Sequence, residues 1–121
     1  MNKVELQDRM LKFALRIMKL ADSMPNSLSS QTIARQIVRS GTSPYANYSA
    51  ACIAKSDKDF LNKLKMVEEE LDETRRWIDL IIAGEIMPAS RMNEIVQENK
   101  ELVSIITKAI ITMRNKINCK E

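Results

Sequence analysis

Apolar residues recur at alternating steps of three and four along most of the chain, the spacing that places them on one face of an α-helix. The first such segment spans about residues 3–24 and ends where Pro25 disfavours helical geometry. Its stripe is Leu6, Met10, Phe13, Ile17, Leu20 and Met24. The clearest register follows residue 56: Phe60, Leu64, Val67, Leu71, Thr74, Ile78 and Ile81. Beside it runs a second apolar edge of Leu61, Trp77 and Leu80.

Residues that begin or end helices divide the pattern into four segments. Serines between 27 and 30 offer N-caps for a second helix, and Ser56 can cap the third. Gly84 supplies a stop, and Pro88 stands where a last helix can begin. The short connections favour antiparallel neighbours. The chain therefore predicts one all-α domain over residues 1–121, an antiparallel up-down-up-down four-helix bundle with helices at approximately 3–24, 30–55, 57–83 and 89–118.

The second segment keeps helical spacing through two residues that oppose helices, Gly41 and Pro44. Because Pro44 removes one backbone hydrogen bond and pushes against the carbonyl of Ser40, we expect a kinked second helix. Most residues around Pro44 are small, which lets neighbouring backbones approach closely. The second helix is therefore predicted to lie between other helices.

Composition agrees with packed helices and excludes several other classes. The chain is 45% hydrophobic but only 4% aromatic, and it has 2 Gly and 3 Pro, too few for a sheet protein with many tight turns. Its apolar runs are far shorter than the ~18 residues of a membrane span. Charged residues interrupt the N-terminal segment where a signal peptide would be apolar, so we expect a cytoplasmic protein with no membrane contact. Cys52 and Cys119 stand in different contexts and are predicted to be free thiols.

The sequence offers no catalytic or cofactor motif. It contains no His, which removes Ser-His and Cys-His pairs, the usual zinc ligand sets and the Glu-x-x-His motifs of di-iron bundles. The carboxylate run Glu68, Glu69, Glu70, Asp72 and Glu73 could hold a hard cation in principle. We favour a solvated face that pairs with Lys65, Arg75 and Arg76, with ion pairs between subunits as a further reading. We expect no catalytic residue, no metal, no cofactor and no enzymatic activity.

Charge is distributed unevenly, although the net charge is only +3. Residues 1–56 carry eight basic and three acidic side chains, a balance of +5, so this half is a candidate surface for an anionic partner. Candidate nucleic-acid contacts are Arg9, Lys12, Arg16, Lys19, Arg35, Arg39 and Lys55. Such residues also commonly flank an apolar stripe and remain hydrated. With few aromatic residues for stacking, any contact with RNA or DNA should go to the phosphate backbone.

Two consecutive stretches carry a family resemblance. SGTSPYANYSAACIAKS, from Ser40, followed by DFLNKLKMVEEELDETRRWIDLI, from Asp59, resembles the bacterial four-helix-bundle family labelled ribosomal protein S23 or 23S rRNA intervening-sequence protein. The family pattern has Arg where this chain has Ser49 and Ile53, which weakens a nucleic-acid role through those positions. Arg39, Asn47, Tyr48 and Lys55 persist and could still contact a phosphate or a neighbouring helix.

The resemblance implies an up-down bundle that assembles into a homopentameric ring, and kinship with accessory proteins of diversity-generating retroelements. It carries no enzymatic activity. A ring would repeat each basic stripe five times and favours an oligomeric adaptor that binds structured nucleic acid or a nucleoprotein. The alternative is a structural scaffold with protein partners alone. Residues expected at or near the contact between copies lie in the second helix and on the spare edge of the third: Gly41, Pro44, Tyr48, Ala50 and Trp77.

Overall fold

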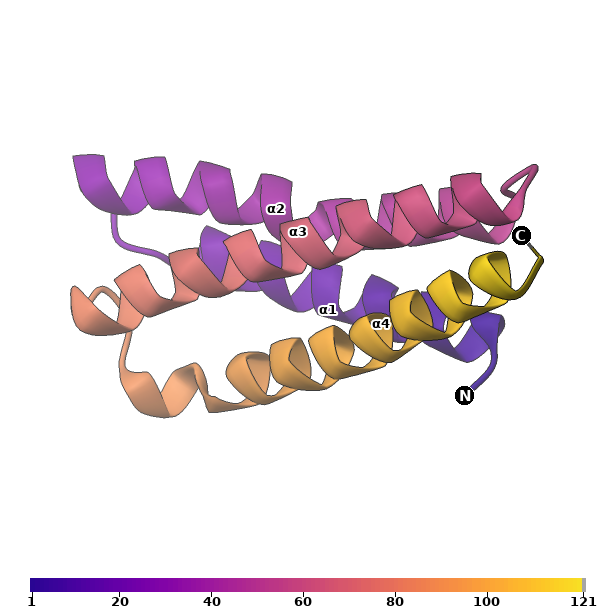
Figure 1. The fold of residues 1–121 in the computed structure, drawn as a ribbon. Coiled ribbons are helices and arrows are strands. Elements are labelled where there is room, and N and C mark those ends of the chain that lie inside the picture. Colours follow the sequence, from indigo (N-terminus) through magenta and orange to yellow (C-terminus); the bar gives the residue numbers. More distant parts are fainter. Residues whose placement is uncertain (121) are drawn as a thin grey trace.

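The computed structural model, which describes residues 1–120, is a bundle of four long helices (Figure 1). Helices α1 (Lys3–Asp22), α2 (Leu28–Cys52), α3 (Asp57–Ala83) and α4 (Asn93–Lys120) follow one another, with a short 3₁₀ turn, η1 (Ala89–Arg91), before the last. The start of α1, the end of α4 and the α2–α3 turn lie at one end of the bundle (Figure 1). The predicted all-α four-helix fold is confirmed.

Side-chain caps fix where three of the helices begin. Asn2 accepts a hydrogen bond from the Glu5 amide at the start of α1, and Ser56 accepts from the Asp59 amide at the start of α3, as predicted. Because Ser27 caps the Ser30 amide, α2 begins at residue 28 and not near 30.

Four other boundaries differ from the sequence expectation. Helix α1 ends at 22, and α2 ends at 52 where the predicted helix reached 55. Pro88 opens the 3₁₀ turn, so α4 begins at 93, four residues later than expected, and it continues to 120.

Helix α2 runs without interruption through Gly41 and Pro44 and packs against both α1 and α3. The expected position between other helices is thus confirmed, while the kink at Pro44 stays a prediction. Gly41 lies against Ile17 of α1, where a side chain would meet the neighbouring helix. Pro44 itself is buried within the bundle.

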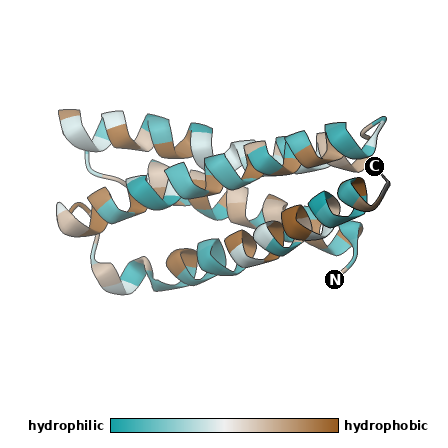
Figure 2. Ribbon diagram, viewed as in Figure 1, coloured by the Kyte–Doolittle hydropathy of each residue, from teal (hydrophilic) through white to brown (hydrophobic). Residues whose placement is uncertain are grey.

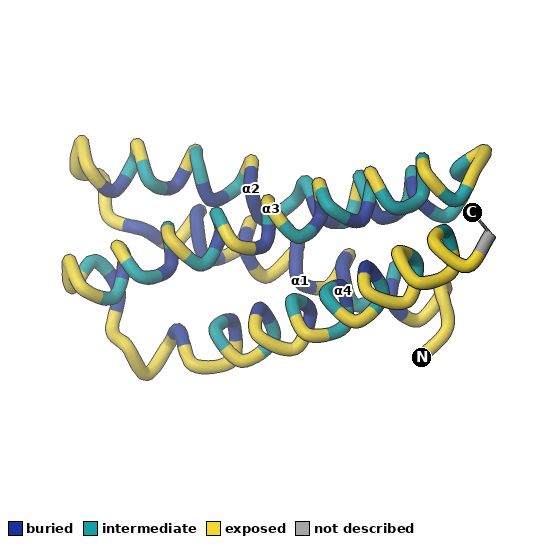
Figure 3. Tube along the Cα trace, in the orientation of Figure 1, coloured by how far each residue is buried: buried dark blue, intermediate teal, exposed yellow. Residues whose placement is uncertain are grey.

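The apolar stripes meet along the axis of the bundle, with polar residues outward (Figures 2 and 3). Every predicted position of the first stripe, from Leu6 to Met24, is buried, and the third stripe is buried from Leu64 to Ile81. The largest fully enclosed side chains include Met10, Phe13, Ile17, Ile37, Leu64, Leu71, Ile78, Met92, Leu102 and Ile106. The core is therefore aliphatic, as the composition predicts.

Hydrogen bonds between helices satisfy polar groups inside this core. The hydroxyls of Ser40 on α2 and Thr74 on α3 lie 2.9 Å apart and are both fully buried. Asn99 of α4 donates its side-chain N–H to the carbonyl oxygen of Leu71, 3.0 Å away. Such pairs fix the alignment of α2 and α4 on α3, because an unpaired buried polar group would cost about 1–3 kcal/mol.

Candidate nucleic-acid interface

The basic stripe predicted on the first helix, Arg9, Lys12, Arg16 and Lys19, lies beside α4. These four side chains line two adjoining hollows between the helices, of about 330 Å³ and about 300 Å³, which share Arg16 and Glu94. Helices α1 and α4 contact each other less extensively than the other neighbouring helix pairs, which leaves this groove open. The structure therefore brings together four of the seven basic residues that the sequence nominated.

Carboxylates of α4 neutralise one end of the groove. The guanidinium of Arg9 binds Glu98 through two nitrogens, with Nε 3.1 Å from Oε2, and lies 3.7 Å from a Glu101 carboxylate oxygen. The hydrogen bond from Arg9 to Glu98 raises the pKa of Arg9, and partial burial opposes that rise. The two N–H groups of the guanidinium match the two oxygens of the carboxylate, which makes this ion pair a strong one. A phosphate would therefore have to displace Glu98 to reach Arg9.

The next two members of the stripe are engaged more weakly. Lys12 pairs with Asp8 of its own helix at 2.8 Å, and both side chains are exposed. Arg16 lies 3.6 Å from Glu94, whose side chain is 85% exposed. Pairs this exposed contribute about 0–1 kcal/mol, so an incoming phosphate can replace either carboxylate at little cost.

An excess of positive charge remains where the groove reaches η1. Arg16, Lys19 and Arg91 line the hollow there, and among its described lining residues Glu94 alone is acidic. Neither Lys19 nor Arg91 forms an ion pair within residues 1–120. We call Arg16, Lys19 and Arg91 the Arg91 cluster. Sequence reasoning missed Arg91, because it belongs to a short 3₁₀ turn whose placement against α1 depends on the path of the chain between α3 and α4.

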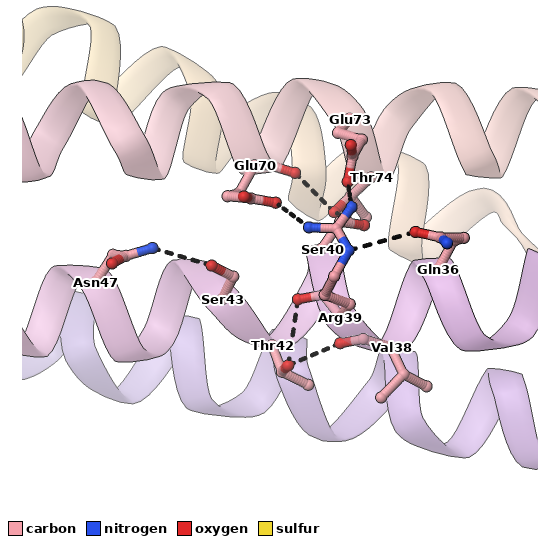
Figure 4. Close-up of polar contacts among 10 residues, drawn as sticks. All are labelled: Gln36, Val38, Arg39, Ser40, Thr42, Ser43, Asn47, Glu70, Glu73 and Thr74. Carbon is pink, nitrogen blue, oxygen red and sulfur yellow. Dashed lines mark hydrogen bonds and ion pairs between the residues drawn. The ribbon is translucent and has the colours of Figure 1, made fainter.

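The other three nominated basic residues lie apart from the groove. Arg39 of α2 binds Glu73 and, at 3.2 Å, Glu70 of α3 (Figure 4). Arg35 is exposed beside a shallow hollow between α1 and α2, and Lys55 lies in the α2–α3 turn. The structure therefore does not combine all seven residues into one surface, and Arg39 acts as a link between helices.

Residues proposed for the contact between copies divide into two groups. Gly41, Pro44 and Tyr48 are buried within one chain, so they pack its interior, and Tyr48 cannot reach a phosphate as the sequence suggested. Ala50 and Trp77 are half-buried and keep surface for another copy. The Trp77 indole Nε1 is enclosed and has no hydrogen-bond acceptor among residues 1–120.

An exposed apolar face on α1 was not foreseen from the sequence. Val4, Leu11, Leu15 and Met18 repeat at steps of seven, four and three, which places them on one side of the helix, and all four are exposed. We call this set the outer apolar face. A period search that also scored the weaker apolar positions of the first helix would have found it.

The acidic run of α3 spreads over several surfaces of that helix. Glu70 and Glu73 bind Arg39, Glu68 accepts a hydrogen bond from Thr107, and Asp72 lies 3.9 Å from Arg76. Of the expected basic partners, Arg76 pairs with the run, whereas Arg75 pairs with Asp79. Within residues 1–120, no three acidic or cysteine side chains gather closely enough to hold a metal ion.

Comparison with known proteins places the chain in a family. A family described as 23S rRNA-intervening sequence protein matches residues 2–108. The chain belongs to this family. A crystal structure from Bacteroides thetaiotaomicron, described as a protein of unknown function from the S23 ribosomal protein family, is 33% identical to it. The alignment covers 87% of this chain and 97% of that protein with a TM-score of 0.82. A comparison with curated proteins found no match.

Membership of the 23S rRNA-intervening sequence protein family confirms the resemblance seen in the residues from Ser40 onward. The kinship with retroelement accessory proteins and the homopentameric ring stay predictions. Within the part of the chain that the structure describes, none of the helices combines the length and the apolar character needed to cross a bilayer.

Proposed function

We propose that this 23S rRNA-intervening sequence family protein is a non-enzymatic oligomeric adaptor that contacts the phosphate backbone of structured nucleic acid. One observation carries the proposal, the net positive charge of the Arg91 cluster at the end of the α1–α4 groove. Positive charge in a concave surface attracts phosphates more strongly than the same charge on a convex one, because the field is concentrated there. Arg91 and Lys19 need no carboxylate removed before they bind.

Contact with the backbone, and not with bases, follows from where the aromatic side chains lie. Phe13 and Tyr48 are buried, and Tyr45, Phe60 and Trp77 pack against the core. Base stacking needs an exposed aromatic face, which the described residues of the α1–α4 groove do not offer, because the aromatic residue that lines it, Phe13, is 1% exposed. The adaptor should therefore bind without strong sequence preference.

Assembly supplies the avidity that one small cluster lacks. A homopentamer would present the Arg91 cluster five times, and several phosphate contacts made together bind far more tightly than one. Light scattering tests this part of the proposal. A species of five chains supports it, and a single species of one chain contradicts it.

Nucleic-acid binding is tested by fluorescence anisotropy with a labelled RNA hairpin and a DNA duplex over a range of salt concentrations. The Lys19→Glu/Arg91→Glu variant should bind more weakly and show a smaller salt slope, by about 0.7–0.9 for each phosphate that the variant no longer neutralises. A matched control, Lys100→Glu/Lys108→Glu, makes the same charge change at exposed positions of α4 outside the groove. Absence of binding at low salt, or an equal decrease in affinity in both variants, rejects the proposal.

A structural scaffold for protein partners is the second candidate, favoured by the outer apolar face on α1. Exposed apolar residues in a row are typical of surfaces that another protein covers. Affinity capture from nuclease-treated lysate separates the two candidates. A partner that remains after nuclease treatment and is absent with a Leu11→Gln/Leu15→Gln variant favours the scaffold, and a partner that nuclease treatment removes favours the adaptor.

A further inference from the structure

A second basic hollow lies at the opposite end of the bundle from the Arg91 cluster. It measures about 440 Å³ and is lined from the start of α1, the α2–α3 turn and the last turns of α4. Figure 1 shows these segments at the same end of the bundle. Three lysines from these three segments line it: Lys3, Lys55 and Lys116. We call it the Lys55 hollow. The lysines are separated by up to 113 positions along the chain (116 − 3), so they meet only in the folded protein.

Contacts within the hollow hold two of the three ammonium groups in place. The Lys3 ammonium lies 4.9 Å from the centre of the Phe60 ring, and Lys116 Nζ lies 3.5 Å from a carboxylate oxygen of Asp57. Lys55 has no ion pair within residues 1–120. The hollow is therefore partly organised before any ligand arrives, which reduces the entropy that binding would cost.

The charge of the hollow is unbalanced, unlike the part of the α1–α4 groove near Arg9. Among the lining residues that the structure describes, three ammonium groups face one acidic residue, Asp57, which leaves a balance of +2. Near Arg9, three basic residues face three glutamates, a balance of zero. Like charges gathered in a concavity repel one another, and a bound anion of two charges would remove that repulsion.

The shape of the hollow and its uncharged walls further define the anion. Phe60, Met113, Ala51 and Ala54 give it apolar walls beside the lysines. Inorganic phosphate would use only the charged part, whereas a phosphate carrying an organic group could also cover the apolar part. A phosphate monoester carries nearly two negative charges at neutral pH, which matches the excess charge.

We propose that the Lys55 hollow binds a phosphate monoester, with Lys3, Lys55 and Lys116 around the phosphate and the organic part against Phe60 and Met113. A nucleotide and the phosphorylated end of a nucleic-acid strand share this chemistry. The site is separate from the Arg91 cluster, so it stands whether or not the adaptor function does.

Cys52 lines the same hollow and provides a direct readout of occupancy. In a Cys119→Ser background Cys52 is the only thiol, since the chain contains 2 Cys. The rate at which a neutral maleimide modifies Cys52 is measured with increasing inorganic phosphate, adenosine monophosphate, and two otherwise identical oligonucleotides that end in a 5′-phosphate or a 5′-hydroxyl. Sodium chloride at matched ionic strength serves as the blank.

Saturable protection of Cys52 by adenosine monophosphate or by the 5′-phosphorylated strand, beyond that by inorganic phosphate, supports the proposal and identifies the source. Lys3→Gln/Lys55→Gln should lower the apparent affinity measured by this protection about tenfold. Each exposed ammonium group contributes about threefold to that affinity. Lys58→Gln, an exposed lysine next to the hollow but outside its lining, should leave it unchanged.

Three outcomes overturn the proposal: protection no greater than that by sodium chloride, equal protection by the 5′-phosphate and 5′-hydroxyl strands with none by adenosine monophosphate, or an equal decrease in protection in the Lys58→Gln control. The second of these outcomes would indicate backbone contact of the kind proposed for the Arg91 cluster. The Lys19→Glu/Arg91→Glu variant separates the two sites, because it should weaken hairpin binding and leave protection of Cys52 intact.

Discussion

Gly41 of α2 and Ile17 of α1 approach so closely that a Cβ atom on the glycine would stand 2.7 Å from Ile17 Cγ2 and 2.8 Å from Cγ1. Real Cβ atoms almost never make contacts this short. Because Ile17 is fully buried and β-branched, it has little freedom to move aside. The glycine therefore sets the distance between α1 and α2.

The first prediction is that Gly41→Ala destabilises the protein, although alanine is the better helix former by about 1 kcal/mol. Overpacking of a tight core costs about 1–3 kcal/mol, so we expect a net destabilisation of about 1 kcal/mol, and a larger one for Gly41→Leu. Urea unfolding followed by circular dichroism measures the change. Arg35→Ala, an exposed change on the same helix, should lie within about 0.5 kcal/mol of the parent. A Gly41→Ala protein more stable than the parent would show that the helices can separate without cost.

The bundle itself could be predicted from the sequence because its cause is local. A stripe such as Leu6 to Ile17 recurs at helical spacing, and Ser56 marks a helix start, whichever helix becomes the neighbour. The small residues around Gly41 likewise predicted a close approach. What they could not specify is the partner, since Ile17 becomes the contact only through the alignment of α1 on α2. That alignment depends on the whole core.

The second prediction concerns the buried hydroxyl pair of Ser40 and Thr74. Thr74→Val keeps the shape of the side chain but removes the partner of the Ser40 hydroxyl, 2.9 Å away. Leaving a buried hydroxyl unpaired costs about 1–3 kcal/mol, so Thr74→Val should lower the free energy of unfolding by that order. Ser40→Ala/Thr74→Val should lower the free energy of unfolding by less than the sum of the single changes, because it leaves neither hydroxyl buried and unpaired. Strict additivity in urea unfolding would mean that each hydroxyl is satisfied without the other, as Thr74 can be by the Glu70 carbonyl oxygen, 2.8 Å away.

The candidate sites were only partly foreseeable, for a reason that the residues of α1 illustrate. Helical spacing predicted that Arg9, Lys12, Arg16 and Lys19 share a side of one helix. It could not predict that Glu98 of α4 would neutralise Arg9, because ion pairs between helices depend on their alignment. The same limit hid Arg91, and it hid the meeting of Lys3, Lys55 and Lys116, which come from three segments.

The third prediction is that the Arg9–Glu98 pair couples α1 to α4. Both side chains are partly shielded from water, at 27% and 19% exposed, and the contact is two-pointed. We expect a coupling free energy of about 1 kcal/mol in a double-mutant cycle of Arg9→Ala and Glu98→Ala. The cycle for the exposed pair Asp8 and Lys12 should give about 0.5 kcal/mol or less and should weaken in high salt. Equal coupling in the two cycles would assign Arg9 no special role in joining the helices.

The fourth prediction is a decrease in stability at high pH caused by Tyr48. Burial, and after it the electrostatic influence of Cys52 and a hydrogen bond with Cys52, together raise the pKa of the Tyr48 phenol to about 12 from an ordinary 10.0. In a Tyr45→Phe background, where Tyr48 is the one remaining tyrosine, ultraviolet titration of the folded protein should show the phenolate forming near pH 12. Phenolate formation near the ordinary value would mean that water reaches the ring.

The sign of the effect on stability follows from counting protons. Below pH 10 the phenol is protonated in both the folded and the unfolded chain, so Tyr48 contributes no pH dependence. Between pH 10 and about 12 the unfolded chain releases the proton while the folded chain keeps it. The free energy of unfolding should therefore fall across this window, by at most about 1.4 kcal/mol per pH unit. Tyr48→Phe has no phenol proton to release. The difference in unfolding free energy between parent and variant should therefore be constant below this window, and within it the parent should lose stability relative to the variant. A constant difference throughout would exclude Tyr48 as the cause, because every other titrating group is common to both proteins.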